Sequence, residues 1–168
     1  NRKNRQEVYP MRRKDREITD WDSMLDMVQH CDCCRLGLLD EDGAYILPLN
    51  FGAAVEDGVL ALYFHGAQEG KKIALLRENP HISFEMDTGH RLVPGAQAAE
   101  YTFAYRSVMG RGTVTFLETD ADKLRGLNCI MGHYTHRDDW TVDPAMLRAT
   151  AVFRLQVESW SAKEHHLP

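Results

Sequence analysis

At 168 residues the chain has the length of one domain, enough for a single hydrophobic core. Its 43% hydrophobic and 27% charged residues exclude a disordered chain, and no apolar run approaches the ~18 residues of a membrane-spanning helix. The net charge of -5 argues against a nucleic-acid-binding protein, which usually has a basic face. We therefore expect neither a membrane nor a nucleic acid as partner.

The first 18 residues are predicted to form a basic arm before a single domain that comprises residues 19–168. The arm is rich in arginine and lysine: Arg2, Lys3, Arg5, Arg12, Arg13, Lys14 and Arg16. Such an arm could touch RNA or an acidic surface, but a solvated charged tail is the simpler interpretation. No apolar segment follows these basic residues, so we expect no signal peptide and a cytoplasmic location.

A helix and a series of short strands are predicted in the first half of the chain. Thr19 is a favourable N-cap residue, and apolar residues follow it at helical spacing: Trp21, Leu25 and Val28. Turn residues then separate three strands, over residues 35–39, 44–49 and 59–64. The second strand is expected to continue to residue 55 with a kink at Gly52. The third strand has no polar face, so it is expected to be buried on both sides.

The second half of the chain adds helices between longer strands. Helices are predicted over residues 71–78 and 120–136, with a short helical turn over 144–149. Strands are predicted over residues 81–86, 101–117 and 151–160, and a loop over 88–98. The segment 101–117 contains two glycines and is either a hairpin or one long bent strand. Early hairpins and few βαβ units predict a mainly β fold, an antiparallel barrel with flanking helices.

Three of the four cysteines, Cys31, Cys33 and Cys34, lie within four positions, which is poor spacing for a disulfide framework. Together with His30 they suggest a metal site, but structural zinc prefers two separated pairs of ligands, and this cluster has no second pair. We therefore predict reduced thiols near a helix end, and no metal site.

The strongest candidate for chemistry is the segment 64–72, in which a strand, a turn with two glycines and a helix with two lysines follow one another. The free N–H groups of a helix N-terminus, together with Lys71 and Lys72, make a site for an anion. Gly66 and Gly70 lie one residue too close for a P-loop, so a phosphate fits better than a nucleoside triphosphate with Mg²⁺. The alternative is an ordinary turn followed by a solvated lysine face.

Other motifs give little support to hydrolase or dinucleotide chemistry. The chain has no GxSxG and no HExxH motif, and Gly110-x-Gly112 leads into a strand rather than a helix. His133 and His136 can share a helix face, but two histidines alone are more often surface residues than metal ligands. The aromatic residues either fill the core or a dimer interface, or line a pocket for a flat ligand: Tyr101, Phe103, Tyr105, Trp140 and Trp160.

Six short motifs lie in order between residues 11 and 108, and the resemblance that they support covers residues 11–160. They are Met11-Arg12-Arg13-Lys14-Asp15-Arg16, Pro48-Leu49-Asn50-Phe51, Tyr63-Phe64-His65-Gly66-Ala67, Gly70-Lys71-Lys72, Asn79-Pro80 and Tyr105-Arg106-Ser107-Val108. This ordered set resembles the flavin-nucleotide-binding split-barrel proteins related to pyridoxamine 5'-phosphate oxidase. Within that superfamily it is most similar to the nitroimidazole-resistance group.

The resemblance implies an antiparallel split β-barrel and a homodimer with FMN at the subunit interface, although FAD is an alternative. Residues expected along the isoalloxazine ring are Pro48, Leu49, Asn50 and Phe51. Residues expected at the phosphate are His65, Gly66, Ala67, Lys71 and Lys72. Ser107 is expected to add a polar contact to the flavin, and Trp140 to border its open face. His65 is also a candidate proton donor, although a contact to the phosphate or the ring is the favoured interpretation.

The expected function is that of an FMN-dependent oxidoreductase that reduces small flat acceptors such as nitroaromatics. Pyridoxamine 5'-phosphate oxidase has an Arg-x-His-x-Arg motif after Glu-x-Trp, but here Ser161-Ala162-Lys163-Glu164-His165 follows Trp160. A basic residue at the start of the segment 48–53 is missing too, so oxidation of pyridoxamine 5'-phosphate is not expected. Two alternatives are a flavin-binding carrier or sensor without turnover, and a barrel that binds haem through a histidine.

Overall fold

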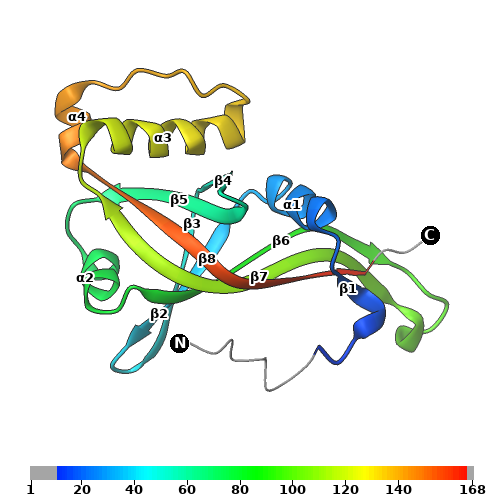
Figure 1. The fold of residues 1–168 in the computed structure, drawn as a ribbon. Helices are drawn as coiled ribbons and strands as arrows, with labels where there is room; N and C mark the ends of the chain where they lie inside the picture. Colours follow the sequence, from blue (N-terminus) through cyan, green and yellow to red (C-terminus); the bar gives the residue numbers. More distant parts are fainter. Residues whose placement is uncertain (1–10, 166–168) are drawn as a thin grey trace.

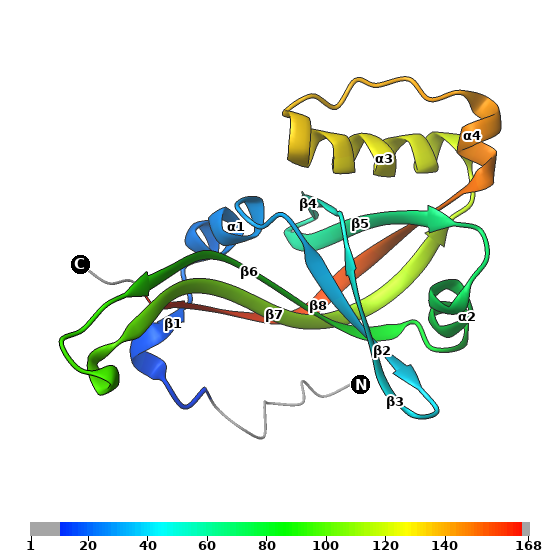
Figure 2. The same ribbon diagram turned by 180° about the vertical axis from the view of Figure 1, so that it is seen from behind.

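The structure is a computed structural model that describes residues 11–165; the first ten residues of the predicted basic arm lie outside this range. An eight-stranded sheet forms most of it, with strand order β3-β2-β6-β7-β8-β5-β4 (Figures 1 and 2). Every neighbouring pair of strands is antiparallel. The strands are β1 (Glu17–Ile18), β2 (Cys34–Asp40), β3 (Gly43–Leu49), β4 (Gly52–Glu56), β5 (Val59–Ala67), β6 (His81–Val93), β7 (Thr102–Leu117) and β8 (Thr150–His165).

The direct connection between β3 and β4 forces this sheet to curl. The two strands are at opposite ends of the strand order, yet only Asn50 and Phe51 separate them. In a flat sheet these edges would be roughly 29 Å apart at ~4.8 Å per strand, whereas Leu49 and Gly52 can be at most ~11 Å apart. The sheet therefore curls until its edges meet, without closing, and the predicted antiparallel split barrel is confirmed.

The helices lie against the sheet and close its ends. They are α1 (Trp21–Gln29), α2 (Lys71–Glu78), α3 (Asp120–Thr135) and α4 (Pro144–Ala149), with short 3₁₀ turns η1 (Lys14–Arg16) and η2 (Ala98–Glu100). The N-cap of α1 is Asp20 and not the predicted Thr19, because the Asp20 carboxylate accepts hydrogen bonds from the Ser23 N–H and hydroxyl. The long helix α3 packs across β4, β5 and β8 (Figure 1). None of the helices in residues 11–165 is long and apolar enough to cross a membrane.

The apolar side chains form two clusters on the two sides of β5. The main core fills the barrel, with Phe51, Phe64 and Phe153 fully buried. A smaller cluster lies beneath α3 and contains Ala61, Tyr63 and Ile130. Residues 60–64 are all buried, so the prediction that this strand is covered on both sides is confirmed.

Some element boundaries differ from the predictions, and one alternative that the sequence left open is decided. The expected loop at 88–98 is mostly strand, because β6 continues to Val93 and pairs with β7, with a register shift between Thr88 and Arg91. Polar, solvent-exposed residues hide this extension in the sequence. The segment 101–117 is one long strand rather than a hairpin. At the start of the domain, Glu17 and Ile18 pair with the end of β8, so the last residues of the predicted arm belong to the sheet.

The second predicted strand does not continue to residue 55, because β3 ends at Leu49 and residues 52–56 form β4 at the opposite edge of the sheet. Gly52, at the start of β4, leaves no room for a side chain beneath α3. A Cβ atom there would lie 2.5 Å from the backbone of Cys129 and Ile130, whereas a Cβ at Gly37 would have its nearest neighbour at 3.9 Å. We expect Gly52→Ala to lower the free energy of unfolding by about 1–3 kcal/mol, and Gly37→Ala to leave it nearly unchanged. Denaturant unfolding of the two variants measures this, and equal stabilities would contradict the packing of α3 on β4.

Candidate functional site

The end of β5 and the start of α2 form an uncapped helix N-terminus. Gly70 is the N-cap residue of α2, and its φ of +124° is a conformation that favours glycine. Its lack of a side chain means that no cap accepts a hydrogen bond from the first N–H groups of α2. Those donors and the positive end of the helix dipole are therefore available to an anion.

Lys72 brings a positive charge to the same place. A Cβ at Gly66 would lie 2.6 Å from the Lys72 Nζ atom, so the ammonium group occupies the space that glycine leaves open. Lys72 is half-buried, and this loss of hydration lowers its pKa. Within residues 11–165 it makes no hydrogen bond or ion pair. An unpaired ammonium group beside free helix N–H groups is a donor set that fits a phosphate ester.

His65 lies next to Gly66 at the end of β5, with a side chain that reaches the surface. Its pKa is lowered, first because neighbouring atoms remove part of its hydration and second because of the positive charge of Lys72. The imidazole is therefore neutral at pH 7, with one nitrogen that can donate and one that can accept a hydrogen bond.

Lys71 points to a different partner. Its Nζ atom lies 2.6 Å from Asp40 Oδ2 and 4.9 Å from the centre of the Tyr45 ring. This ion pair raises the pKa of Lys71 and lowers that of Asp40. Lys71 thus fastens α2 to the β2–β3 hairpin, while Lys72 faces Gly66. Ala67 ends β5 with an exposed side chain.

The segment 48–51 presents only some of its residues to the outside. Pro48 is exposed on β3, an edge strand, where a residue without an N–H group breaks no ladder bond to a further strand. Leu49 packs against the core and Asn50 is exposed. Phe51 is fully buried against the ring of His133, with ring centres 4.3 Å apart. Pro48 and Asn50 are therefore the side chains of this segment that face outward.

Ser107 and Trp140 lie away from His65 in the same chain. Ser107 pairs with Lys163 and His65 with Val152, so 11 residues of β8, roughly 36 Å of strand, separate them. Trp140 follows α3, where its N–H donates to Asn128 Oδ1 at 2.9 Å and its indole N–H to the Arg137 carbonyl. Helix α3 lies between this loop and β5 (Figure 1). One chain thus does not bring all the predicted flavin contacts together.

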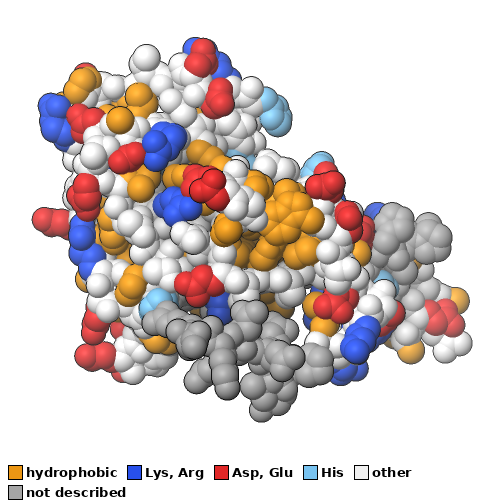
Figure 3. All heavy atoms as spheres, viewed as in Figure 1, with side chains coloured by type: hydrophobic (Ala, Val, Ile, Leu, Met, Phe, Trp, Pro, Cys, Tyr) orange, Lys and Arg blue, Asp and Glu red, His pale blue; other side chains and the backbone are white. Residues whose placement is uncertain are grey.

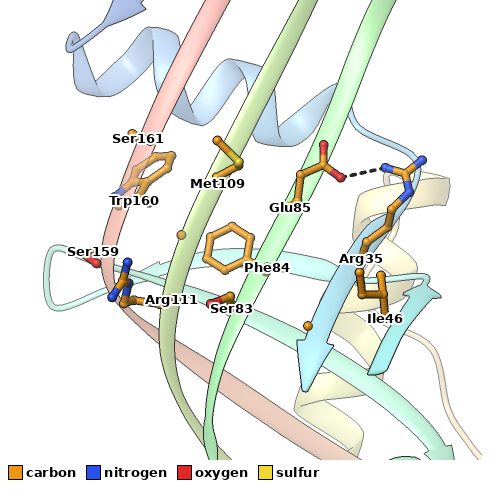
Figure 4. A pocket seen from close by; sticks show the side chains of 12 residues that line it. Arg35, Ile46, Ser83, Phe84, Glu85, Met109, Arg111, Ser159, Trp160 and Ser161 are labelled. Carbon is orange, nitrogen blue, oxygen red and sulfur yellow. Dashed lines mark hydrogen bonds and ion pairs between the residues drawn. The ribbon is translucent and has the colours of Figure 1, made fainter. Parts of the chain in front are cut away.

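The outer face of the sheet contains a hollow of about 530 Å³ that sequence analysis did not identify (Figure 4). Gly37 leaves part of its floor open, and the Phe84 ring fills the space beside Gly110. Ile46 and Met109 border the hollow with 65% and 48% of their surface exposed. Strand pairing places Pro48 and Ser107 on this same face, in the rows that contain Arg35 and Asp87. In β3 and β7, exposed apolar residues alternate with core residues. This alternation was the only signal of the outer face in the sequence.

Ion pairs and aromatic contacts border the hollow. Arg35 lies 3.0 Å from Glu85 and 2.9 Å from Asp87, so its charge is already neutralised. Trp160 at the other side of the hollow meets Trp21 of α1 edge to face, with ring centres 5.3 Å apart. Figure 3 shows hydrophobic side chains gathered near α1, with acidic and basic side chains interspersed over the rest of that view.

All four cysteines are free thiols. Cys31 and Cys34 are buried, and burial raises the pKa of Cys31 to about 12 and that of Cys34 further. Burial raises the pKa of Cys129 to about 11. In residues 11–165 no three potential ligands lie close enough together to hold a metal ion. The thiols of Cys31, Cys34 and Cys129 are therefore protonated at pH 7 and poor nucleophiles.

The split barrel resembles known proteins over most of its length. The sequence profile of the pyridoxamine 5'-phosphate oxidase family matches residues 20–164, and this chain belongs to that family. A candidate 5-nitroimidazole antibiotic resistance protein from Bacteroides thetaiotaomicron is 32% identical, with a TM-score of 0.76 over 88% of this chain and 86% of that one. The resemblance proposed from the sequence motifs is thus confirmed.

Two further solved structures share the fold at lower identity. A flavocytochrome from Azotobacter vinelandii is 20% identical over 94% of this chain and 73% of its own, with a TM-score of 0.76. An FAD- and haem-binding protein from Mycobacterium smegmatis is 19% identical over 90% of this chain and 74% of its own, also with a TM-score of 0.76. No curated protein matches the sequence.

Proposed function

We propose that this chain binds FMN as a homodimer and transfers electrons from the flavin to small flat acceptors such as nitroaromatics. The observation that supports this most directly is the Lys72 ammonium group, which lies over Gly66 at the uncapped start of α2 and has no partner within the described residues. The likeness to a candidate nitroimidazole-resistance protein supports the choice of acceptor.

In this proposal each part of the chain has a distinct role toward the flavin. Lys72 and the first N–H groups of α2 bind the phosphate, and neutral His65 donates one hydrogen bond to it or to the ring. Pro48 at the end of β3 and Asn50 in the β3–β4 connection face the ring. The flavin, when bound, supplies the transfer of electrons, and the protein positions it and admits the acceptor.

The site is completed by a second copy of the chain. Lys72 and Ser107 are too far apart along one sheet to hold a single flavin, whereas Ser107 shares the exposed outer face with the apolar residues Ile46 and Met109. A twofold-symmetric pair would bury this face and bring Ser107 of one chain to the anion site of the other. Trp140 is not among the residues of its own chain that are proposed to contact the phosphate or the ring.

The acceptor is a flat molecule without a phosphate group. The end of β8, where the oxidase motif would supply cations, is occupied by internal contacts. His165 donates from Nδ1 to the Phe103 carbonyl at 2.8 Å and accepts at Nε2 from Arg16 at 3.1 Å. Glu164 lies 3.8 Å from Arg106. These contacts support the expectation that pyridoxamine 5'-phosphate is not the substrate.

The two adjacent lysines provide a matched test of FMN binding. Lys72→Ala should raise the Kd for FMN about ten- to a hundredfold, the loss of one charge-assisted hydrogen bond of about 1.5–3 kcal/mol. Lys71→Ala, whose ammonium group is bound to Asp40, should change it less than about threefold. Fluorescence titration measures both, and riboflavin, which has no phosphate, should bind the two variants alike. If Lys72→Ala bound FMN as tightly as the wild type, the phosphate assignment would be wrong.

Mixed dimers test whether two chains form each site. Lys72→Ala and Ser107→Trp should each weaken FMN binding in homodimers. A heterodimer of the two variants would contain one site with both changes and one site with neither, so about half of its sites should regain wild-type affinity. Light scattering gives the mass of each preparation. If every site lay within one chain, mixing the variants would restore nothing.

Two substrates distinguish the proposed activity from its alternatives. After anaerobic reduction of the FMN-loaded protein, a nitroimidazole should restore the absorbance of oxidised flavin, because the open site admits a flat acceptor. Pyridoxamine 5'-phosphate should not reduce the oxidised protein, since the charge-assisted hydrogen bonds that its phosphate needs are missing. Reaction with pyridoxamine 5'-phosphate alone would indicate an oxidase, and reaction with neither compound would indicate a carrier or sensor. The mass of the released cofactor separates FMN from FAD, and a Soret band would indicate haem.

A further inference from the structure

The last turn of α3 is hydrogen-bonded to the connection between β3 and β4. The Phe51 N–H donates to the Tyr134 hydroxyl oxygen at 3.1 Å, and that hydroxyl donates to the Asp32 carbonyl at 2.8 Å. One side chain therefore links the β3–β4 connection to the loop between α1 and β2. The bond to Phe51 joins residues 83 positions apart in the sequence.

His133 adds a second contact between the same three segments. Its Nε2 lies 2.8 Å from the Cys31 carbonyl, which can only accept, so this nitrogen bears the proton. Its ring packs on Phe51, and Cys31 and Phe51 are both buried. Two neighbouring residues of α3 thus fix the position of Phe51, one through its N–H group and one through its ring.

The hydrogen bond from Phe51 also determines which way the preceding carbonyl points. A trans peptide is planar, and its C=O and N–H groups point in opposite directions. There are no cis peptide bonds in the described residues. Because the Phe51 N–H points toward Tyr134, the Asn50 carbonyl points away from it. Asn50 is exposed, so this acceptor belongs to the outward part of the connection.

We propose that Tyr134 is a positioning residue of the flavin site, which orients the Asn50–Phe51 peptide for contact with the isoalloxazine ring. This inference rests on the proposed function. The ring of a flavin has an N–H group that can donate a hydrogen bond to a backbone carbonyl. Tyr134 holds such a carbonyl, that of Asn50, in one orientation. Tyr134 acts on the ring part of the site, whereas Lys72 acts on the phosphate part.

The test uses two ligands, FMN and lumiflavin, the second of which has the ring but no phosphate. Tyr134→Phe removes only the hydroxyl group and should raise the Kd of both ligands about tenfold, the loss of a single hydrogen bond. It should also change the visible circular dichroism of bound flavin and speed hydrogen exchange of the Phe51 amide. Lys72→Ala should weaken FMN but not lumiflavin.

Tyr63→Phe is the matched control. Tyr63 also lies beneath α3, but its hydroxyl donates to Glu56 and not to the β3–β4 connection. It should leave the affinity for both ligands and the dichroism unchanged. If Tyr134→Phe fails to fold, His133→Leu removes the bond to Cys31 and places an apolar side chain against Phe51, and it should weaken both ligands several-fold.

The outcomes separate this inference from the proposed function. Wild-type protein that bound neither ligand would overturn the proposed function itself. Wild-type protein that bound both, with a Tyr134→Phe variant of equal affinity and dichroism, would overturn only the role of Tyr134. An equal loss in Tyr63→Phe would show general loosening of α3 and would also overturn it. Loss of both ligands in Tyr134→Phe alone supports the role.

Discussion

Two residues, Asn50 and Phe51, join the opposite edges of the sheet, and this short connection determines where the rest of the candidate site lies. It makes the sheet curl into a split barrel and drives the Phe51 ring into the core, while Asn50 and Pro48 stay outside. Because the barrel curls, the β2–β3 hairpin meets the start of α2, where Asp40 binds Lys71. The candidate anion site at the start of α2 therefore lies beside this hairpin.

The charges of this region are unevenly balanced. Lys71 has a carboxylate partner, but Lys72, half-buried beside it, has none within the described residues. Removing an ammonium group from water without a counter-charge is unfavourable, and the lowered pKa of Lys72 reflects that strain. A bound phosphate would remove the imbalance. Functional sites commonly keep such unfavourable groups because the ligand satisfies them.

Sequence reasoning could predict the candidate anion site because its signal is local. A strand end, a turn with glycines and a helix start occupy adjacent residues, and their chemistry follows from their order. It could not separate Lys71 from Lys72, since consecutive helix residues point in different directions and only the neighbouring hairpin decides which one has a partner. Likewise, polar residues 88–91 hid the extension of β6, because a protruding hairpin needs no buried face.

His133 and Tyr134 show the limit of sequence patterns more clearly. By sequence, His133 was one of two histidines on a helix face; in the structure it packs on Phe51 and donates to Cys31. Tyr134 had no signal at all, since its partners Asp32 and Phe51 belong to distant segments. Tyr101 and Phe103 alternate like core residues, yet 49% and 47% of their surfaces are exposed.

The sequence by itself therefore determined the order of the elements, the buried strand at 59–64, the glycine turn before α2 and the family. Only the tertiary structure decided that Lys72 rather than Lys71 faces Gly66, that Ser107 lies far from His65, and that α3 positions the β3–β4 connection. The physical reason is that periodicity and turn chemistry describe each residue's own segment. They do not state which segment will lie opposite, and hydrogen bonds such as that between Phe51 and Tyr134 form only after the sheet has curled.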